Sequence, residues 1–250
     1  MRRVVSLLVL MGLWAAVFGP AAQAADKPAK IQVLVITGDD VSVHPWKEIA
    51  DATTDAMAAT GKFEVKRSED CKPLESADHL KPYDVIVWTR FNTKPVVLSD
   101  QAKENLLDFV KGGKGFFVQH LASASFPKWD GFNKLCGRYW VMGKSGHGLR
   151  SVFESKIVDK AHPITKGLES FKTDDELYAK LQGDAPVHVL VEAYSDWSKK
   201  AEPLVFVQEC GKGRVVHNAY GHDGKALKTP EVRKIIARGV EWAATGKVCE

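Results

Sequence analysis

The segment Gly-Lys-Gly-Phe-Phe-Val-Gln-His, residues 113–120, is the strongest indication of the fold. Its three successive large apolar residues predict a strand buried on both faces, which runs directly into Gln119 and His120. A helix is expected just before it, because Ser99 can cap a helix whose apolar face ends at Gly112. A helix followed by a two-sided apolar strand is typical of α/β proteins with a parallel sheet.

The same alternation of short apolar runs and amphipathic stretches occurs upstream. Residues 31–36 and 84–88 read as buried strands, and residues 63–66 alternate like an edge strand. A helix is predicted to open at Pro45 and to end at Gly61. Its inward face would carry Trp46, Ile49, Ala50, Thr53 and Met57. The first half of the chain therefore predicts an α/β fold with a mostly parallel sheet between helices.

After residue 130 the pattern changes to strands with little helix between them. We expect these strands to be antiparallel additions to the sheet: residues 152–158, 187–191, 204–207 and 214–218. A last helix is predicted to begin at Thr229-Pro230 and to run to Ala243. No linker rich in proline or serine interrupts the chain, so residues 25–250 are expected to form a single domain.

The first 24 residues have the three parts of a signal peptide. A basic start, Met1-Arg2-Arg3, precedes the apolar run Val4–Phe18, and Ala22-Gln23-Ala24 supplies small residues for cleavage. The alternative is an uncleaved membrane anchor, but the run is shorter than the roughly 20 residues that span a bilayer. We therefore expect a mature chain that begins near Ala25, has no membrane anchor and is periplasmic or secreted.

Composition excludes several classes of protein. With 45% hydrophobic and 26% charged residues among 250, the chain is neither disordered nor a disulfide-scaffold miniprotein. A net charge of +4, from 35 basic and 31 acidic residues, is too small and scattered for a nucleic-acid binder. Export would permit disulfides, but the sequence does not decide how Cys71, Cys136, Cys210 and Cys249 pair, or whether they do.

Histidines follow three of the predicted strands. Ligands of open α/β sheets bind beyond the carboxyl ends of the strands. His44 follows the first strand, His120 ends the segment quoted above, and His222-Asp223 follows the strand at residues 214–218. A single histidine there is more often a hydrogen-bonded structural residue, whereas three at one edge of the sheet indicate a site.

Two further polar segments are candidates, each with a plain structural alternative. The loop Gly143–Gly148 carries His147, and its alternative is an ordinary surface turn. The segment Asp174-Asp175-Glu176 precedes Tyr178, and its alternative is a solvated loop. The other four histidines are interpreted as structural: His79, His162, His188 and His217.

Two common types of site lack their residues. Residues 113–120 occupy the place of a nucleophile elbow, yet the elbow carries Gln119 and His120 with no cysteine. Amide or ester hydrolysis would depend on Ser123 instead. Lys111–Gly115 has glycine and lysine without phosphate-loop spacing, and it precedes a strand rather than a helix.

Seven segments together resemble the trehalose-utilisation, ThuA-like family of the class I glutamine-amidotransferase-like superfamily. They cover nearly the whole mature chain in order: His44-x-Trp46, Tyr83–Val87, Gly113–His120, His162–Thr165 with Gly167-Leu168, Asp175–Tyr178, Gly211–Val215 and Gly221–Asp223. The resemblance implies a flavodoxin-like three-layer sandwich and a role in carbohydrate utilisation, on disaccharides or their keto forms. Without the superfamily's cysteine nucleophile, glutamine hydrolysis is not implied. His217 and Cys136-Gly137-Arg138 depart from the family pattern and bear on the shape of the pocket.

The leading hypothesis is an exported enzyme that acts on a sugar by acid–base chemistry. His222, oriented by Asp223, and His120 would transfer protons, with Glu176 as a carboxylate partner. Substrate contacts would come from His44, Gln119, His147 and Trp46, with Trp129 or Trp140 as further aromatic surfaces.

Two alternatives remain open. Some of the same histidines could ligate a divalent metal, although no H-x-H or H-E-x-x-H spacing supports it. The chain could also be a non-catalytic carbohydrate-binding or scaffold domain. The sequence leaves the substrate, the reaction class, the metal and the oligomeric state undetermined.

Overall fold

The central feature of the molecule is a nine-stranded mixed sheet. A computed structural model describes residues 29–38, 41–94 and 96–249. The strand order is β2-β1-β3-β4-β9-β8-β7-β5-β6. The predicted signal peptide lies outside the described residues. Within them, no helix combines the length and the apolar character that a membrane span requires.

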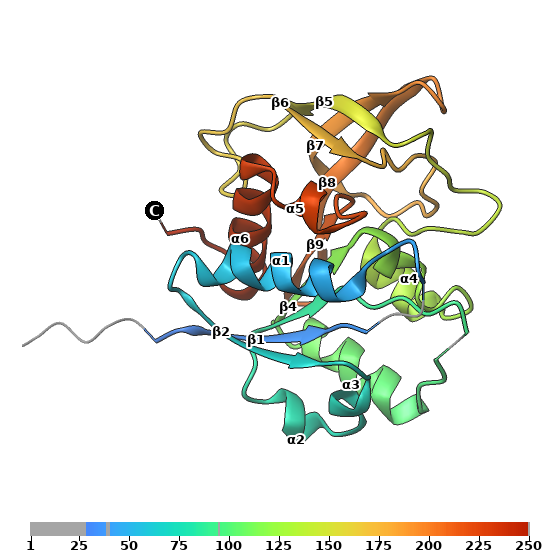
Figure 1. Ribbon diagram of the computed structural model, residues 1–250. Helices are drawn as coiled ribbons and strands as arrows, with labels where there is room; N and C mark the ends of the chain where they lie inside the picture. Colours follow the sequence, from blue (N-terminus) through green and yellow to red (C-terminus); the bar gives the residue numbers. More distant parts are fainter. Residues whose placement is uncertain (1–28, 39–40, 95, 250) are drawn as a thin grey trace, which may run out of the picture.

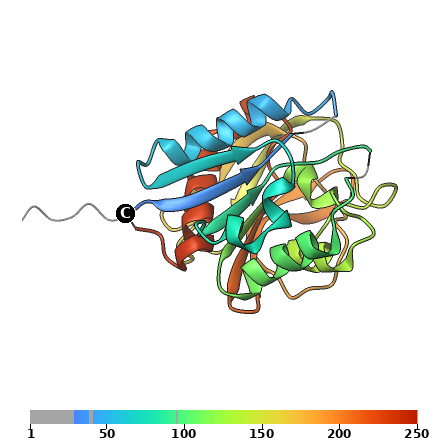
Figure 2. The same ribbon diagram turned by 90° about the horizontal axis from the view of Figure 1, so that it is seen from below.

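Five neighbouring strands form the parallel half of the sheet. They are β2 (Phe63–Ser68), β1 (Ile31–Ile36), β3 (Val85–Trp88), β4 (Gly115–Gln119) and β9 (Gly213–Asn218). Each pair of neighbours is parallel, and Figure 2 shows them side by side. The expectation that β9 is an antiparallel addition is wrong for its pairing with β4: β9 enters the sheet in the same direction as β4, so its carboxyl end lies at the same edge.

The other four strands are antiparallel, as predicted for three of them. They are β8 (Lys200–Cys210), β7 (His188–Ser195), β5 (Ser151–Ile157) and β6 (Phe171–Asp175). The sequence analysis did not anticipate β6. The sheet curls, so that β5 and β6 lie at the top of the molecule above α5 (Gly224–Leu227) and α6 (Pro230–Thr245) (Figure 1).

Helices cover both faces of the parallel half. One face packs against α1 (Trp46–Ala58) and α6, and the other against α2 (Ala77–Leu80), α3 (Asp100–Lys111) and α4 (Asp130–Cys136). The two short 3-10 helices are η1 (Lys72–Glu75) and η2 (His120–Ala124). This arrangement confirms the predicted α/β sandwich with parallel and antiparallel strands. The sheet is less parallel than predicted, since four of its eight neighbouring pairs are antiparallel.

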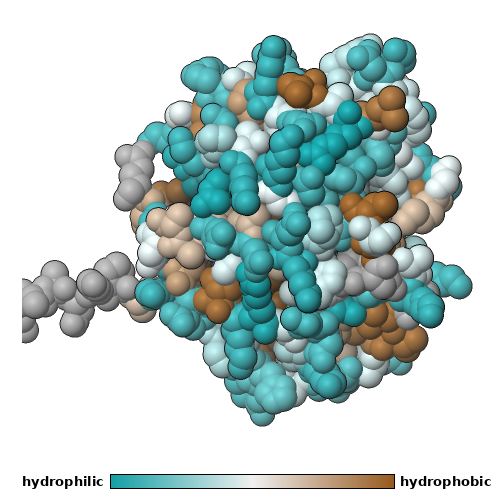
Figure 3. All heavy atoms as spheres, viewed as in Figure 1, coloured by the Kyte–Doolittle hydropathy of each residue, from teal (hydrophilic) through white to brown (hydrophobic). Residues whose placement is uncertain are grey.

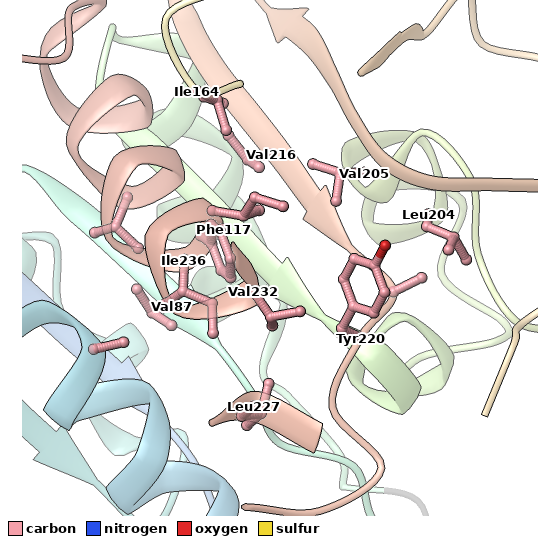
Figure 4. Packing of buried hydrophobic residues seen from close by; sticks show 14 of the residues in the cluster. Val87, Phe117, Ile164, Leu204, Val205, Val216, Tyr220, Leu227, Val232 and Ile236 are labelled. Carbon is pink, nitrogen blue, oxygen red and sulfur yellow. The ribbon is translucent and has the colours of Figure 1, made fainter. Parts of the chain in front are cut away.

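The alternation of side chains along β4 divides the core into two apolar clusters. Phe117 points toward α1 and α6, whereas Phe116 and Val118 point toward α3 and α4. Figure 4 shows Phe117 with Val232 and Ile236 of α6. The helix approaches so closely that a Cβ on Gly115 would lie 2.6 Å from the backbone of Ala243. Glycine at this position is therefore required for the packing of α6 on the sheet.

The apolar side chains on the viewed face (Figure 3) are dispersed, and the four cysteines are unpaired. Figure 3 shows a mostly hydrophilic face on which apolar side chains form separate small groups. All four cysteines are free thiols; Cys71 and Cys136 are buried, whereas Cys249 is exposed.

Candidate metal centre

The carboxyl ends of β1, β4 and β9 bring the three predicted histidines together. His44 lies in the loop after β1, His120 directly follows β4, and His222 lies four residues beyond the end of β9. Glu176, just after β6, joins them. Each of these four residues offers one ligand atom, and the four atoms lie within 4.8 Å of one another.

Glu176 is the centre of the group. Its Oε2 atom lies 3.7 Å from His44 Nε2 and 3.5 Å from His120 Nε2. Its Oε1 atom lies 3.1 Å from His222 Nδ1 and 3.5 Å from His147 Nε2. The Glu176 side chain is only 13% exposed, so a carboxylate and several imidazoles share a volume from which most water is excluded.

The backbone of His120 is unusual, and it aims the ring. Its φ is +51°, in the left-handed region that few residues other than glycine adopt. This is the sharp strand-to-helix turn of a nucleophile elbow, with an imidazole in place of the nucleophile. His120 Nδ1 lies 2.7 Å from the carbonyl oxygen of Ala219 and must donate to it. His120 Nε2 therefore carries a lone pair, is buried, and has no hydrogen-bond partner.

His44 and His222 also present buried nitrogens to the group. Both ring nitrogens of His44 lack hydrogen-bond partners, although the residue is only 7% exposed. His222 Nδ1 faces Glu176 without hydrogen-bond geometry. Buried polar atoms are rarely left unpaired in native proteins. Unpaired imidazole nitrogens that converge on one carboxylate are therefore a donor set suited to a cation.

Asp175 holds the turn that carries His222. It is fully buried and accepts the backbone N–H groups of Gly221 and His222 at 2.8 and 3.1 Å, together with that of Glu176 at 2.8 Å. One carboxylate thus positions two of the four candidate ligands. Sequence reasoning placed Asp175 in a carboxylate cluster but did not find this role, because it depends on β6 lying beside the β9 turn.

The electrostatics of the group favour a charged carboxylate. Burial alone would raise the pKa of Glu176, but the imidazoles of His120, His222 and His44 hold that pKa far below its ordinary value. Glu176 in turn raises the pKa of His222. Burial lowers the pKa of His44, so that ring is neutral and its lone pair is available. Burial raises the pKa of Asp175.

The donor set fits a divalent transition metal. Neutral imidazole and carboxylate suit Zn²⁺ and its neighbours. Two ligand atoms on a tetrahedral ion with bonds of about 2.1 Å lie about 3.4 Å apart. The contacts of the two Glu176 oxygens with the imidazoles, at 3.1–3.7 Å, are close to that spacing, and the four ligand atoms as a set lie within 4.8 Å of one another. His120 also has the outer hydrogen bond to a carbonyl that commonly orients metal-binding histidines.

A cavity of about 290 Å³ opens beside the histidines. His44, His147 and Glu176 line one part of it, and Trp140 and Tyr178 lie next to them. The Tyr178 ring stacks on His120 with 4.0 Å between centroids, and Trp140 lies 4.4 Å from Tyr178. His147 is 32% exposed, and its Nδ1 donates to the carbonyl of Gly148. Trp140, not Trp129, is thus the tryptophan at the site.

Three sequence-based assignments are wrong in their geometry. Asp223 does not orient His222: its carboxylate accepts from Arg150 and from the backbone N–H of Ala226, where it caps α5. Burial opposes ionisation of Asp223, but Arg150 lowers its pKa. Asp223 therefore has a structural role, as the ion-pair partner of Arg150.

Gln119 and Trp46 do not line the cavity. Gln119 lies on the same face of β4 as Phe117, and its amide donates to Thr53 Oγ1 of α1 at 3.1 Å. Trp46 begins α1, with Lys47 Nζ 5.4 Å from its ring centre. Strand alternation explains the Gln119 error, since neighbouring residues point to opposite faces.

The four histidines that were interpreted as structural lie outside the group. His217 is fully buried, with Nδ1 3.2 Å from the carbonyl oxygen of Cys136. His188 pairs with Asp159 at 3.0 Å, and its ring lies 5.8 Å from that of His162. His79 is exposed on α2.

Comparison with known proteins places the chain in a family. The family model described as "ThuA: Trehalose utilisation" matches residues 32–243. A ThuA-like protein from Parabacteroides merdae ATCC 43184 is 27% identical with a TM-score of 0.76, over 88% of this chain and 92% of that one. A ThuA-like protein from Bacteroides uniformis ATCC 8492 is 16% identical with a TM-score of 0.64, over 92% and 98%.

Other comparisons support the fold alone or found nothing. The cold-adapted β-galactosidase from Rahnella sp. R3 is 14% identical, with a TM-score of 0.57 over 86% of this chain and 32% of that one. No match was found among curated proteins. The family match spans most of the sequence and includes all four residues of the histidine–glutamate group. The chain therefore belongs to the ThuA family.

Proposed function

We propose that this protein is a metal-dependent enzyme of carbohydrate utilisation, with a divalent ion held by His44, His120, His222 and Glu176. The observation that supports it most is the set of buried, unpartnered imidazole nitrogens around one ionised carboxylate. Without an ion, His44 and His120 keep buried ring nitrogens with no hydrogen-bond partner, which costs free energy in any fold.

The metal would supply Lewis acidity toward a carbonyl or hydroxyl oxygen of the substrate. In this proposal His120 and His222 bind the ion and do not carry protons, which replaces the acid–base roles expected from the sequence. His147 lies at the cavity, outside the set of four, and can hydrogen-bond a substrate oxygen there. Asp175 holds the turn of His222 in place through backbone N–H groups.

The carbohydrate substrate rests on the family description and on the aromatic lining of the cavity. The matched family model is described as trehalose utilisation. Trp140 presents an aromatic ring near the candidate metal ligands, as required for contact with the C–H face of a sugar. A disaccharide or its keto form is the first substrate class to test.

We also propose that the protein is exported, on the sequence of its first 24 residues. Expression with the native N-terminus in a Gram-negative host, followed by mass spectrometry of the protein, checks this. The expected product is a periplasmic chain that begins near Ala25. A cytoplasmic chain that retains Met1–Ala24 would contradict it.

The central test is metal content. The purified chain is expected to bind about one equivalent of a divalent ion when Zn²⁺, Mn²⁺ and Ni²⁺ are titrated separately after chelation. His44→Ala should lower that affinity at least about 100-fold. The matched control is His79→Ala, because His79 is an exposed histidine on α2. Wild-type affinity in His44→Ala would overturn the metal centre.

Activity is tested on the metal-loaded protein with a panel of disaccharides and keto-disaccharides. Turnover that disappears on chelation and returns with the metal supports the enzyme. Sugar affinity without turnover would support the alternative, a carbohydrate-binding domain on the same fold.

A further inference from the structure

The cavity beside the candidate metal ligands has two chemically different ends. The polar groups His44, His147 and Glu176 lie together at one end. Most of the remaining described lining is apolar: Val41, Val43, Phe91, Leu121, Trp140 and Met142. Two hydroxyl-bearing side chains complete the described lining: Tyr178, whose ring stacks on His120 at the polar end, and Thr93.

The indole of Trp140 offers its ring to the cavity but not its N–H group. Its Nε1 donates to the sulfur of Met142 at 3.2 Å, so the donor is already used. The same bond holds Met142 at the mouth, where its side chain is 62% exposed. Val43, also 62% exposed, lines the same cavity from the loop after β1. Two exposed apolar side chains thus border an opening that continues inward to Phe91 and Trp140.

These features disfavour a second sugar ring in the outer part of the cavity. Each hydroxyl of a sugar that leaves water needs a hydrogen-bond partner, and an unmet polar group weakens binding. Apolar side chains supply no such partners. An aromatic ring has no hydroxyls to satisfy, packs against Trp140 and Phe91, and gains from the removal of apolar surface from water.

The size of the cavity limits the number of rings that a ligand can place in it. At about 290 Å³ it is at the small end of ligand pockets, which run from roughly 300 to 1,000 Å³. It can hold one ring at the polar end and one toward the mouth, so the lining, not the volume, distinguishes an aryl group from a second sugar.

From this division, and resting on the metal centre and the carbohydrate role proposed above, we propose that the preferred substrate is an aryl glycoside in place of the disaccharide. Its sugar oxygens lie at the His44–His120–His222–Glu176 end, and its aromatic aglycone lies against Trp140, Met142 and Val43. The specificity of the enzyme is then set by the apolar mouth, which selects an aryl group over a second sugar at the same position.

Binding to the metal-loaded protein tests this without knowledge of the reaction. The probes are phenyl α- and β-D-glucopyranoside, compared with trehalose and maltose by calorimetry, with the ion that binds most tightly in the titration above. At least one phenyl glucoside is expected to bind 10-fold or more tightly than either disaccharide. Met142→Gln and Val43→Thr should each reduce that preference at least about threefold.

The variants are chosen so that the fold is not at risk. Met142 and Val43 are exposed, and neither belongs to the candidate metal ligands, so metal affinity should be unchanged. Val152→Thr is the matched control, because Val152 is an equally exposed valine on β5 that does not line the cavity. It should keep the preference of the wild type.

The outcomes distinguish failure of the aryl-glycoside inference from failure of the proposed function. Disaccharides that bind as tightly as the phenyl glucosides, phenyl glucosides that do not bind, or a preference that survives both mouth variants would overturn the aryl-glycoside inference. In all three cases the metal affinity of the same sample shows separately whether the metal centre stands. Loss of metal binding in the wild type would overturn the proposed function itself.

Discussion

His120 combines a costly backbone conformation with a buried, unpartnered ring nitrogen. A left-handed φ of +51° is unfavourable for an L-residue with a Cβ, by about 1–2 kcal/mol. The fold retains it because the turn aims Nε2 at Glu176, while Nδ1 is held by Ala219. Strain of this kind clusters at functional sites.

Substitutions of His120 can distinguish the effect of its backbone conformation on stability from the effect of its imidazole on metal binding. His120→Asn and His120→Ala both remove the ring, but asparagine tolerates the left-handed region better than alanine. Both variants should lose at least about 100-fold in metal affinity. The asparagine variant should be the more stable by up to about 1 kcal/mol in urea unfolding. If His120→Asn bound the metal like the wild type, His120 would not be a ligand.

His217 is a buried histidine that should make the fold sensitive to acid. Burial lowers its pKa to about 4, whereas an unfolded histidine titrates near 6.5. The unfolded chain therefore binds the extra proton first, and stability falls as the pH drops from about 6.5 to 4. Between these two pH values, the burial of His217 lowers the free energy of unfolding by about 3 kcal/mol.

His217→Gln removes that cost and can still donate to the carbonyl of Cys136. The free energy of unfolding of the variant should depend less on pH between 6.5 and 4 than that of the wild type, and the two curves should run parallel above pH 7. His79→Gln, at an exposed site, is the control and should follow the wild type. Equal slopes for His217→Gln and wild type would contradict the role of burial.

Among the elements, β6 connects the antiparallel part of the sheet to the site. It is the outermost strand of the order, yet the curl of the sheet brings its last residue, Asp175, against the turn after β9. Three backbone N–H groups donate to Asp175 and offset the burial of its charge. These three hydrogen bonds depend on both carboxylate oxygens of Asp175.

Asp175→Asn should weaken the hydrogen bonds that hold the turn of His222. The amide has one acceptor oxygen in place of two, so at least one of the N–H groups of Gly221, His222 and Glu176 loses its partner. The expected cost is about 1–3 kcal/mol of stability and about 10–100-fold in metal affinity. Urea unfolding and metal titration measure the two effects. Asp184→Asn, at an exposed aspartate, should change neither. Unchanged metal affinity in Asp175→Asn would show that Asp175 does not position the candidate ligands.

For the molecule as a whole, periodicity and the strand-end rule predicted the fold and the meeting of His44, His120 and His222. Glu176 was also found, as a carboxylate near an aromatic residue. What the sequence could not show was the proposed metal centre as such, because its candidate ligands follow four separate elements and have no local spacing. Asp223 was misassigned because adjacency to His222 in sequence said nothing about Arg150, 73 positions away.

The same dispersion of ligands makes a prediction about global stability. His44 and His120 follow strands of the parallel half, whereas Glu176 follows β6 of the antiparallel half, so one ion would join parts of the sheet that lie far apart in strand order. An ion that binds only the folded state stabilises it by about 2.7 kcal/mol at a concentration 100 times Kd. For a domain of this size, that corresponds to a rise in Tm of about 5–10 °C.

Thermal unfolding of chelated and metal-loaded protein measures this rise, which should grow with metal concentration. His222→Ala should abolish it, because the remaining ligands no longer enclose the ion. His79→Ala should retain it in full, since His79 lies on exposed α2. If saturating metal left Tm unchanged while calorimetry showed tight binding, the ion would bind the unfolded chain as well. The four residues would then not act as a centre built by the fold.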